Sequence, residues 1–191
     1  MAVRESIRPG GRSARVQASV HAAVRALLAE RDRAELTVPL IAAHAGVTPS
    51  TIYRRWGDLQ ELLADVAVER LQPDAEPEET GSGQGDLLAW AEQYAEEMAS
   101  EPCRAMIRDV LASDSENAGK CCGYTRQQLD VIAERANQRG ERFPNVERVI
   151  DRVVAPIIYR ILFDDTPLDA EAVRGLTGEL FSEARVPELQ A

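Results

Sequence analysis

The sequence predicts an all-α protein of about nine helices, because apolar residues recur at helical spacing along most of the chain. No stretch shows the strict two-residue alternation of a half-buried β-strand. Apolar residues make up 45% of the 191 residues, so the chain can form a packed core. A first helix is expected from Ser13 to Arg31. Its apolar stripe comprises Val16, Val20, Ala23, Val24, Leu27 and Leu28.

Two short helices joined by a glycine turn are predicted next, over residues 37–56. Thr37 can cap the first helix, because its hydroxyl can accept a free backbone N–H of the first turn. Gly46 follows that helix at a position that favours a left-handed backbone. Thr48 can cap the second helix, with Pro49 at its first position. The arrangement is that of a helix-turn-helix.

The second of these helices has an outer face with an unusual composition. Val47, Ile52 and Trp56 are spaced to face a core, which leaves hydroxyls, a phenol and two guanidiniums outside. The outward residues are Thr48, Ser50, Thr51, Tyr53, Arg54 and Arg55. Since no acid is among them, this face suits phosphate oxygens and base edges.

The run TVPLIAAHAGVTPSTIYRRWGDLQELL resembles the DNA-binding segment of the tetracycline-repressor (TetR) family, over about Val16 to Leu63. One departure is Leu59, where the family usually has a phosphate-binding lysine. The resemblance implies a DNA-binding domain (1–57), a connecting helix (58–71) and a larger ligand-binding and dimerisation domain (86–191). The candidate DNA contacts are Arg12, Arg15, Thr37, Thr48, Ser50, Thr51, Tyr53, Arg54 and Arg55.

Charge is distributed unevenly along the chain. The total is −10, yet residues 1–57 carry nine arginines and four acidic residues, a net +5, and the remainder carries −15. A basic segment fused to an acidic one is consistent with a nucleic-acid partner. Arg4, Arg8, Arg12 and Arg15 form a basic arm that either reaches the minor groove and phosphates or is only a solubilising tail. His21 and His44 are expected at the surface or its boundary, without chemistry.

The connecting helix 58–71 opens with Asp58-Leu-Gln-Glu61, which has the form of a capping box. Residues 72–85 are rich in proline, glycine and acid and are expected to form a mobile linker. Further helices are expected over residues 86–100, from 101 through Leu111, over 116–139 with a stop at Gly140, and over 145–163 and 168–184.

The segment 145–163 is apolar around more than one stripe, so two of its sides should be buried. One side can pack on its own domain and the other on a second copy of the chain, in a four-helix bundle with 168–184. The alternative is a central helix of a monomer. Pro156 should bend or interrupt the helix. The expected interface residues are Val153, Val154, Ile157, Ile161, Val173, Leu176 and Leu180.

The family resemblance also implies a pocket for a small molecule in the second domain. Aromatic and sulfur-containing side chains can line it, although most of them can equally be core. The candidates are Trp90, Tyr94, Met98, Cys103, Met106, Tyr124 and Tyr159, with Phe143 beside them. Cys121 and Cys122 are adjacent and lack the spacing of common metal sites.

The sequence contains no catalytic motif and no apolar run long enough to span a bilayer, and its N-terminus is unlike a signal peptide. We therefore expect a cytoplasmic, non-enzymatic protein without a cofactor. The expected function is that of a homodimeric repressor that binds a palindromic operator in double-stranded DNA and is released by an unidentified small molecule. The alternative is a helical ligand-binding or scaffolding protein with a vestigial helix-turn-helix.

Overall fold

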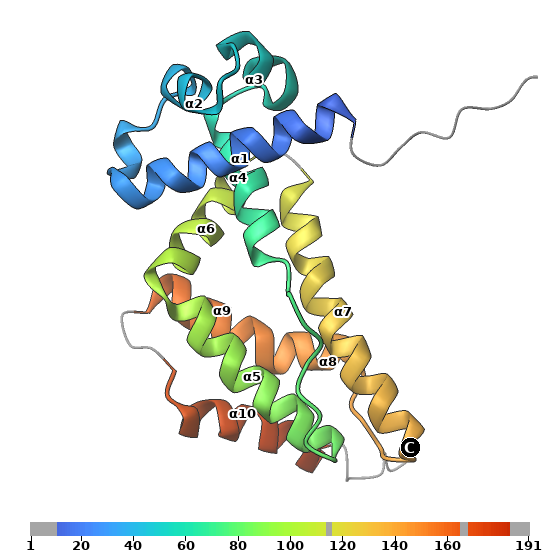
Figure 1. The fold of residues 1–191 in the computed structure, drawn as a ribbon. Helices are drawn as coiled ribbons and strands as arrows, with labels where there is room; N and C mark the ends of the chain where they lie inside the picture. The colour runs from blue at the N-terminus through green and yellow to red at the C-terminus, as the bar shows by residue number, and fades with distance from the viewer. Residues whose placement is uncertain (1–10, 114–115, 165–167, 184–191) are drawn as a thin grey trace, which may run out of the picture.

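The computed structural model describes residues 11–113, 116–164 and 168–183. Those residues form helices and connecting segments without a strand, which confirms the all-α prediction (Figure 1). The N-terminal helices are α1 (Arg12–Glu30), η1 (Arg33–Glu35), α2 (Val38–Ala45), α3 (Pro49–Trp56) and α4 (Leu59–Leu71). The C-terminal helices are α5 (Gly83–Ala99), α6 (Glu101–Ala112), α7 (Asn117–Gln138), α8 (Val146–Val149), η2 (Ile150–Val154), α9 (Ala155–Phe163) and α10 (Ala170–Glu183).

The molecule has two main cores, one in each half of the chain. The N-terminal core joins α1, α2, α3 and α4 around Val24, Ile41, Ile52 and Leu62. The C-terminal core joins α5, α7, η2, α9 and α10. In Figure 1 the first three helices form one end of the molecule, and α10 lies at the opposite end.

Helix α4 belongs to both halves. Its first part contributes Leu62, Leu63 and Val66 to the N-terminal core. Its second part contributes Ala67 and Val68 to a small cluster with Val110 of α6, against which residues of α7 also pack. A displacement of α6 or α7 would therefore also move α4, which is part of the N-terminal core.

The segment expected as one helix over 145–163 is a continuous rod made of α8, η2 and α9. Its middle part, η2, is π-helical and ends two residues before Pro156. Proline lacks a backbone N–H and crowds the preceding turn, so a local change of helical pitch is expected there. The predicted interruption at Pro156 agrees with this geometry.

Residues 72–85, expected to form a mobile linker, make several hydrogen bonds to α7, and the last three of them already belong to α5. Arg135 of α7 donates to the carbonyl of Pro77 (2.7 Å) and to Glu76 (2.7 Å), and Gln128 donates to the carbonyl of Ala75 (3.1 Å). Figure 1 shows the extended chain passing beside α7. Polar groups of α7 therefore tether a segment whose composition alone suggests freedom.

The start of α5 also differs from the expectation that Asp86 caps it. Ser82 is the cap, accepting from Gly85 N (3.1 Å). Asp86 is instead fully buried and accepts from Thr80 N (2.6 Å), Thr80 Oγ1 (2.8 Å) and Arg139 Nη2 (2.8 Å). Burial raises the pKa of Asp86, but the hydrogen bonds from Thr80 and Arg139 outweigh it, so the net pKa is lowered.

None of the described helices is long and apolar enough to cross a membrane.

Candidate nucleic-acid interface

The helix-turn-helix forms as its local signals predict. Thr37 Oγ1 accepts from Leu40 N (3.3 Å) at the start of α2. Gly46 has φ 68° at the end of α2, which is the left-handed region that glycine enters at little cost. Pro49 occupies the first position of α3, and Ile52 is fully buried against the N-terminal core.

The outer face of α3 presents Ser50, Tyr53 and Arg54 to solvent, and Tyr53 is 49% exposed. Thr48 lies just before the helix, where its hydroxyl contacts the hydroxyls of Ser50 (3.0 Å) and Thr51 (2.9 Å) rather than a backbone N–H. No acidic side chain lies within α3. This group of donors is suited to phosphates and base edges.

Arg55 was expected beside Arg54 at the base edges, but the structure ties it to α1. Its Nη1 donates to Ser13 Oγ (2.7 Å) and to the Ser13 carbonyl (3.2 Å), and its Nη2 donates to Gln17. Its guanidinium also lies 5.2 Å from the centroid of the Trp56 ring. These contacts occupy Arg55 in docking α3 on α1 and leave Arg54 as the free guanidinium of this helix.

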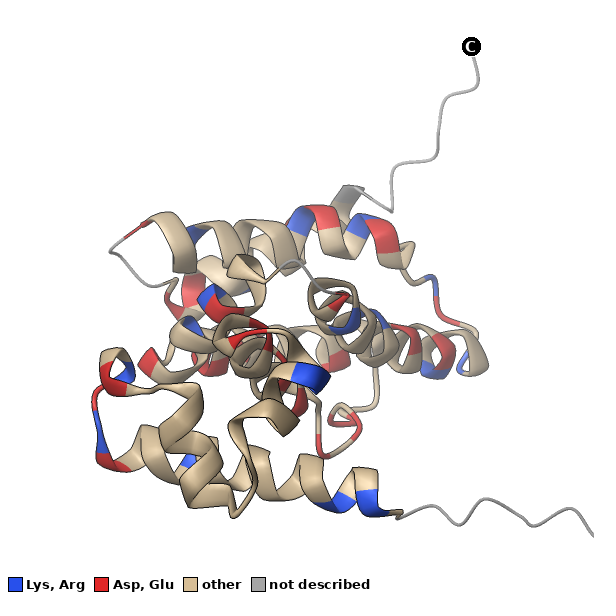
Figure 2. Ribbon diagram, turned by 90° about the horizontal axis from the view of Figure 1, so that it is seen from above, with Lys and Arg blue, Asp and Glu red and all other residues tan. Residues whose placement is uncertain are grey.

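Arg12 and Arg15 lie in the first turns of α1 rather than in a flexible arm, and both are exposed. Figure 2 shows basic residues at this end of α1, beside the helix-turn-helix. Arg4 and Arg8 fall outside the described residues. Leu59, where the family usually has a lysine, is partly buried against the N-terminal core and so has a packing role at the start of α4.

His21 was expected near the surface, and this expectation is wrong. The ring is 1% exposed and lies between α1 and α4. Its Nδ1 is 2.6 Å from Glu69 Oε2, and its Nε2 is 3.0 Å from Asp65 Oδ2. Asp65 Oδ2 also accepts from Trp56 Nε1 of α3 (2.8 Å) and from Gln17 Nε2 of α1 (3.3 Å). His44, in contrast, is exposed as expected.

A direct contact joins the two halves of the chain in addition to α4. Arg33 of η1 forms an ion pair and a hydrogen bond with Asp109 of α6, whose side chain is only 7% exposed. Partial burial lowers the pKa of Arg33 from its usual value, although a guanidinium remains charged. The carboxylate of Asp109 is thus compensated across the boundary between the two halves.

The candidate pocket residues do not lie together. Trp90 is buried in the C-terminal core, where it stacks on Tyr94 at 4.9 Å between ring centroids, and Met98 packs on the same core. Met106 and Tyr124 pack beside α4. Tyr159 is 62% exposed on α9, so its expected place in a pocket is wrong.

Burial of Tyr94 raises its pKa to about 12, against a lowering effect of its hydrogen bond with Thr125 of α7. Cys103 is partly buried on α6. Phe143 makes an edge contact with Phe181, with ring centroids 5.7 Å apart, and therefore belongs to the core.

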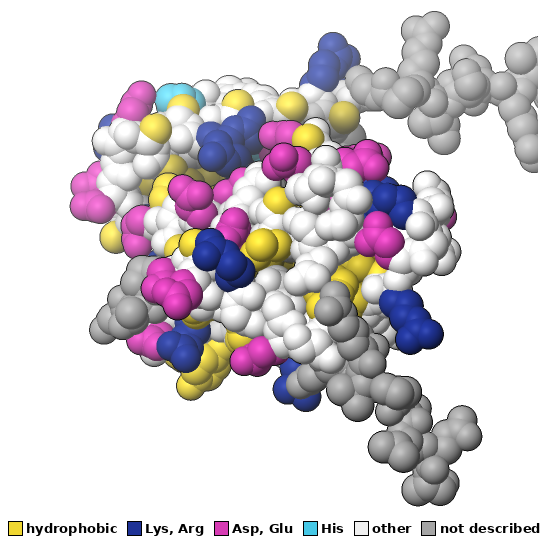
Figure 3. Space-filling model, turned by 90° about the horizontal axis from the view of Figure 1, so that it is seen from below, with side chains coloured by type: hydrophobic (Ala, Val, Ile, Leu, Met, Phe, Trp, Pro, Cys, Tyr) yellow, Lys and Arg dark blue, Asp and Glu magenta, His cyan; other side chains and the backbone are white. Residues whose placement is uncertain are grey.

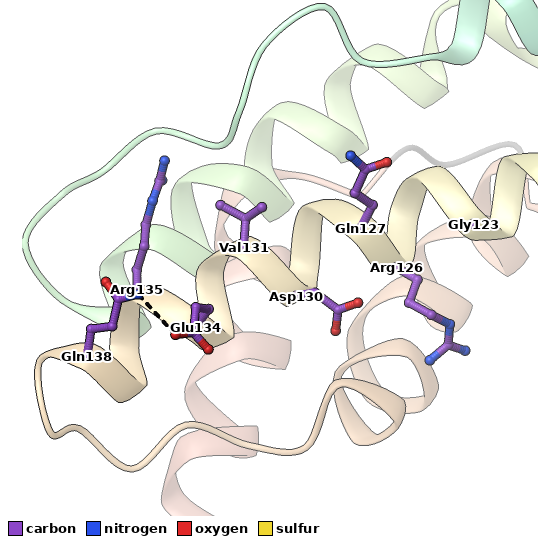
Figure 4. Close-up of a pocket in the computed structure, with 8 residues that line it drawn as sticks. All are labelled: Gly123, Arg126, Gln127, Asp130, Val131, Glu134, Arg135 and Gln138. Atoms are coloured by element: carbon purple, nitrogen blue, oxygen red, sulfur yellow. Dashed lines mark hydrogen bonds between the residues drawn. The ribbon is translucent and has the colours of Figure 1, made fainter.

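One open hollow lies elsewhere, along the outer surface of α7 (Figure 4). It has a volume of about 580 Å³ and is lined only by residues of that helix, with Arg126 and Asp130 beside each other and Val131 and Gln127 on another side. A second hollow continues between α7 and the loop before α8. None of the expected pocket residues except Phe143 lines either hollow.

Six of the seven side chains expected at a dimer interface are instead buried inside the single chain. They are Val153, Val154, Ile157, Ile161, Val173 and Leu180, none of them more than 8% exposed. Leu176, the seventh, is partly buried against the same core. The reason is that α5 and α10 pack on the inner side of the rod, so its outward apolar residues are a different set.

A helix-turn-helix with an acid-free outer face, joined by α4 to a larger helical domain, defines a DNA-binding transcriptional regulator with a separate effector domain. Residues 21–66 match the family described as bacterial regulatory proteins, tetR family, and residues 77–180 match the tetracyclin repressor-like C-terminal domain. The chain belongs to the TetR family of transcriptional regulators.

Individual proteins are similar to this chain in sequence or in fold. The chain is 26% identical over 163 residues to the uncharacterized HTH-type transcriptional regulator Rv1556 of Mycobacterium tuberculosis, covering 81% of this chain and 80% of that one. Among solved structures, the TetR family regulator SCO0332 has a TM-score of 0.67 at 24% identity, covering 90% of this chain and 99% of that one. Thermus thermophilus FadR, in complex with lauroyl-CoA, has a TM-score of 0.64 at 17% identity, covering 92% and 98%.

Proposed function

We propose that this regulator is a cytoplasmic repressor that binds a palindromic operator as a homodimer and releases it when a small molecule binds the C-terminal domain. In this proposal residues 1–57 bind DNA, α4 within 58–71 transmits the signal, 72–85 connects the halves, and 86–191 senses the effector and dimerises. The observation that carries it is the exposed, acid-free face of α3 with Ser50, Tyr53 and Arg54.

The proposed contacts divide by role. Tyr53 and Thr48 position α3 on phosphates, as do Arg12, Arg15 and Thr37 around it, whereas Arg54 and Ser50 face base edges. Arg55 holds α3 against α1 through Ser13 and Gln17. Thr51 is partly buried and linked to Thr48, so it supports this surface from within.

The proposed dimer surface is the outward side of α9. Tyr159 and Phe163 are 62% and 76% exposed and pack on each other with ring centroids 5.3 Å apart. Ile158 and Leu162 are partly buried beside them. A cluster of exposed aromatic and aliphatic side chains favours burial against a second copy. Figure 3 shows that hydrophobic side chains also reach the surface at the end of the molecule opposite the helix-turn-helix.

Two glycines of α10, the exposed Gly175 and the partly buried Gly178, fit the same surface. A Cβ added at Gly175 or Gly178 would meet no atom of the chain within 4 Å. Helices with small residues on one face can approach a partner helix closely, so α10 can pack beside α9 in an intermolecular bundle. Dimerisation would give the two copies of α3 the two-fold symmetry that half-sites one helical turn apart require.

The proposed effector pathway starts from Tyr94, Met98, Cys103, Met106 and Tyr124. Tyr94 is linked to α7 through Thr125, and Met106 and Tyr124 contact the cluster that holds the second part of α4. A ligand that enters between Met106 of α6 and Tyr124 of α7 would separate these two helices. That movement would shift α4 and change the distance between the two recognition helices, which is a population shift between two dimer forms.

Replacing Arg54 by alanine is expected to weaken operator binding by about 1–3 kcal/mol and to relax the sequence preference at one base position, because a free guanidinium that bonds a base edge would be lost. The measurement is a gel shift on the operator and on single-base variants of it, the operator being selected from the DNA upstream of the gene.

Arg55→Ala is the matched control for that experiment. Its loss should weaken binding to all of these sites equally and lower the melting temperature, since Arg55 contacts α1. If Arg54→Ala bound as tightly and selectively as the wild type, Arg54 would not be part of the DNA interface.

Operator affinity is also expected to fall steeply as salt rises. Each phosphate that Arg12, Arg15 or a neighbour neutralises releases condensed counterions, so the slope of log affinity against log salt should be about −0.9 per contact. Measurements across a salt series would give this slope, and Arg15→Ala should reduce it by about one contact. A flat salt series would favour the alternative of a helical ligand-binding or scaffolding homodimer with a vestigial helix-turn-helix.

A further inference from the structure

The contact between α1 and α4 includes a polar cluster around the buried His21 ring, which we call the His21 cluster: His21, Asp65, Glu69, Trp56 and Gln17. The rest of the interface between these helices is aliphatic, with Val20, Val24 and Leu63 in the N-terminal core. A buried imidazole needs a hydrogen-bond partner for each of its ring nitrogens, so the protonation state of His21 affects how well the two helices fit.

Both ring nitrogens of His21 face carboxylate oxygens. Nδ1 is 2.6 Å from Glu69 Oε2 and Nε2 is 3.0 Å from Asp65 Oδ2. A neutral imidazole has one donor and one acceptor, whereas the protonated ring has two donors. Only the protonated ring can donate to both carboxylates, and the neutral ring would place a lone pair against one of them.

The charged groups around the ring come from α4, which packs on it, from its own helix α1, and from α7. Asp65 and Glu69 belong to α4, and Arg25 of α1 donates to Glu69 Oε2 (2.9 Å). Helix α3 contributes the uncharged Trp56, whose ring centroid is 5.9 Å from that of His21. Lys120 of α7 acts through its charge on Asp65.

The pKa directions agree with this geometry. Burial lowers the pKa of His21, but the hydrogen bonds to Asp65 and Glu69 outweigh it, and the net pKa is raised from 6.5. The hydrogen bond from His21 is the largest cause that lowers the pKa of Asp65. For Glu69, burial acts upward, but His21 and Arg25 bring the net pKa down.

We propose that His21 is a positioning residue for the recognition helix α3 and that operator binding is strongest while its ring is protonated. The protonated ring links α1 to α4, and it donates to the same Asp65 carboxylate as Trp56 at the end of α3. The inference rests on the proposed DNA-binding function. Asp65 is the common point, since its Oδ2 accepts from α1 and α3 while its backbone is part of α4. Loss of the proton weakens the packing of α3 against α1 and α4, although His21 itself is not a DNA contact.

The pH window follows from these directions. The raised pKa of His21 gives a stabilising effect that is complete below about pH 6.5 and is lost as pH rises through the folded-state pKa. The lowered pKa values of Asp65 and Glu69 mean that these carboxylates stabilise the folded chain above about pH 4–4.5, and that this stabilisation is lost on acidification. Operator affinity should therefore be highest in mildly acidic solution and fall as the solution becomes alkaline.

The test measures operator affinity of the full chain by fluorescence anisotropy between about pH 5.5 and 8.5 at constant ionic strength. We expect the affinity of the wild type to fall roughly three- to tenfold as His21 loses its proton. His21→Gln should show no such fall. Glu69→Gln should keep the fall but move its midpoint to lower pH. Because Glu69 is 51% exposed, this variant keeps the protein folded even if His21→Gln does not.

The chain has only two histidines, so His44→Gln is a matched control that should keep the wild-type profile. In that variant the only imidazole is His21, whose titration can be followed by nuclear magnetic resonance without DNA. An affinity that stays constant while this imidazole titrates would overturn the inference but not the proposed function. An unchanged midpoint in Glu69→Gln would overturn it as well. Failure to bind any duplex at any pH would remove the proposed function and this inference with it.

Discussion

Replacing Ile157 by arginine is expected to unfold the C-terminal domain. Ile157 is fully buried among Leu87, Ile132 and other side chains of the C-terminal core. An arginine there would leave an unpaired charge in an apolar site and exceed the available volume, at a cost of more than about 4 kcal/mol. That is a large part of the roughly 5–15 kcal/mol that stabilises a typical domain. Thermal unfolding followed by circular dichroism measures the effect.

Tyr159→Arg, two positions along the same helix, is the matched control. Tyr159 points outward and is 62% exposed, so the same charge should leave the helical content of each chain intact, although it should weaken association at the proposed dimer surface. If Ile157→Arg remained fully folded and only changed its mass in solution, Ile157 would lie at a contact between copies rather than in the core of one chain.

The double variant Tyr159→Glu with Phe163→Glu is expected to be a folded monomer with operator affinity reduced by roughly 100-fold or more. The two rings form the exposed aromatic pair of α9, and placing two like charges against their symmetric copies would oppose association. A monomer binds one half-site and loses the gain from binding both at once. Light scattering gives the mass, and gel shift on the whole operator gives the affinity.

Leu111→Glu serves as the control for this surface, because Leu111 of α6 is also 62% exposed and lies on a different helix. It should remain dimeric. A double variant that stayed dimeric with wild-type affinity would place the contact between copies away from α9. A wild type that is monomeric at all concentrations would remove the homodimer from the proposed function.

The local features of the N-terminal half were predictable from the sequence. Caps and turns depend on neighbouring residues, and Thr37, Gly46 and Asp58 act at the positions where the sequence places them. Ile52 is buried because its spacing from other apolar residues puts it on the inner side of α3. In the C-terminal half, Gly140 follows α7 with φ 73°, because glycine enters the left-handed region at a helix end at little cost.

The roles of His21 and Arg55 were not predictable in this way. His21 meets Asp65 and Glu69 from 44 and 48 residues further along the chain, and Arg55 meets Ser13 from 42 residues away. The periodicity of the sequence predicted no partner for His21, and the composition of the outer face of α3 predicted that Arg55 contacts DNA. A histidine within the apolar stripe of α1, followed by acids four residues apart on α4, was the only available signal.

The rod of α8, η2 and α9 shows the same limit for an apolar segment. Its composition indicated that two sides are buried, but apolar residues surround it, so the pattern did not distinguish the side facing the chain's own core. The packing of α5 and α10 decided that Ile157 and Ile161 point inward and that Tyr159 and Phe163 point outward.

The sequence by itself determined the helices, the helix-turn-helix and the family, because each depends on residues within a few turns of one another. The tertiary structure alone decided which arginine of α3 is free and that a histidine of α1 contacts two acids of α4. It also decided that the acidic linker lies along α7 and which apolar face of α9 stays exposed. These outcomes depend on contacts between distant segments, whose energies are set by burial and by the pairing of charges that only the folded chain brings together.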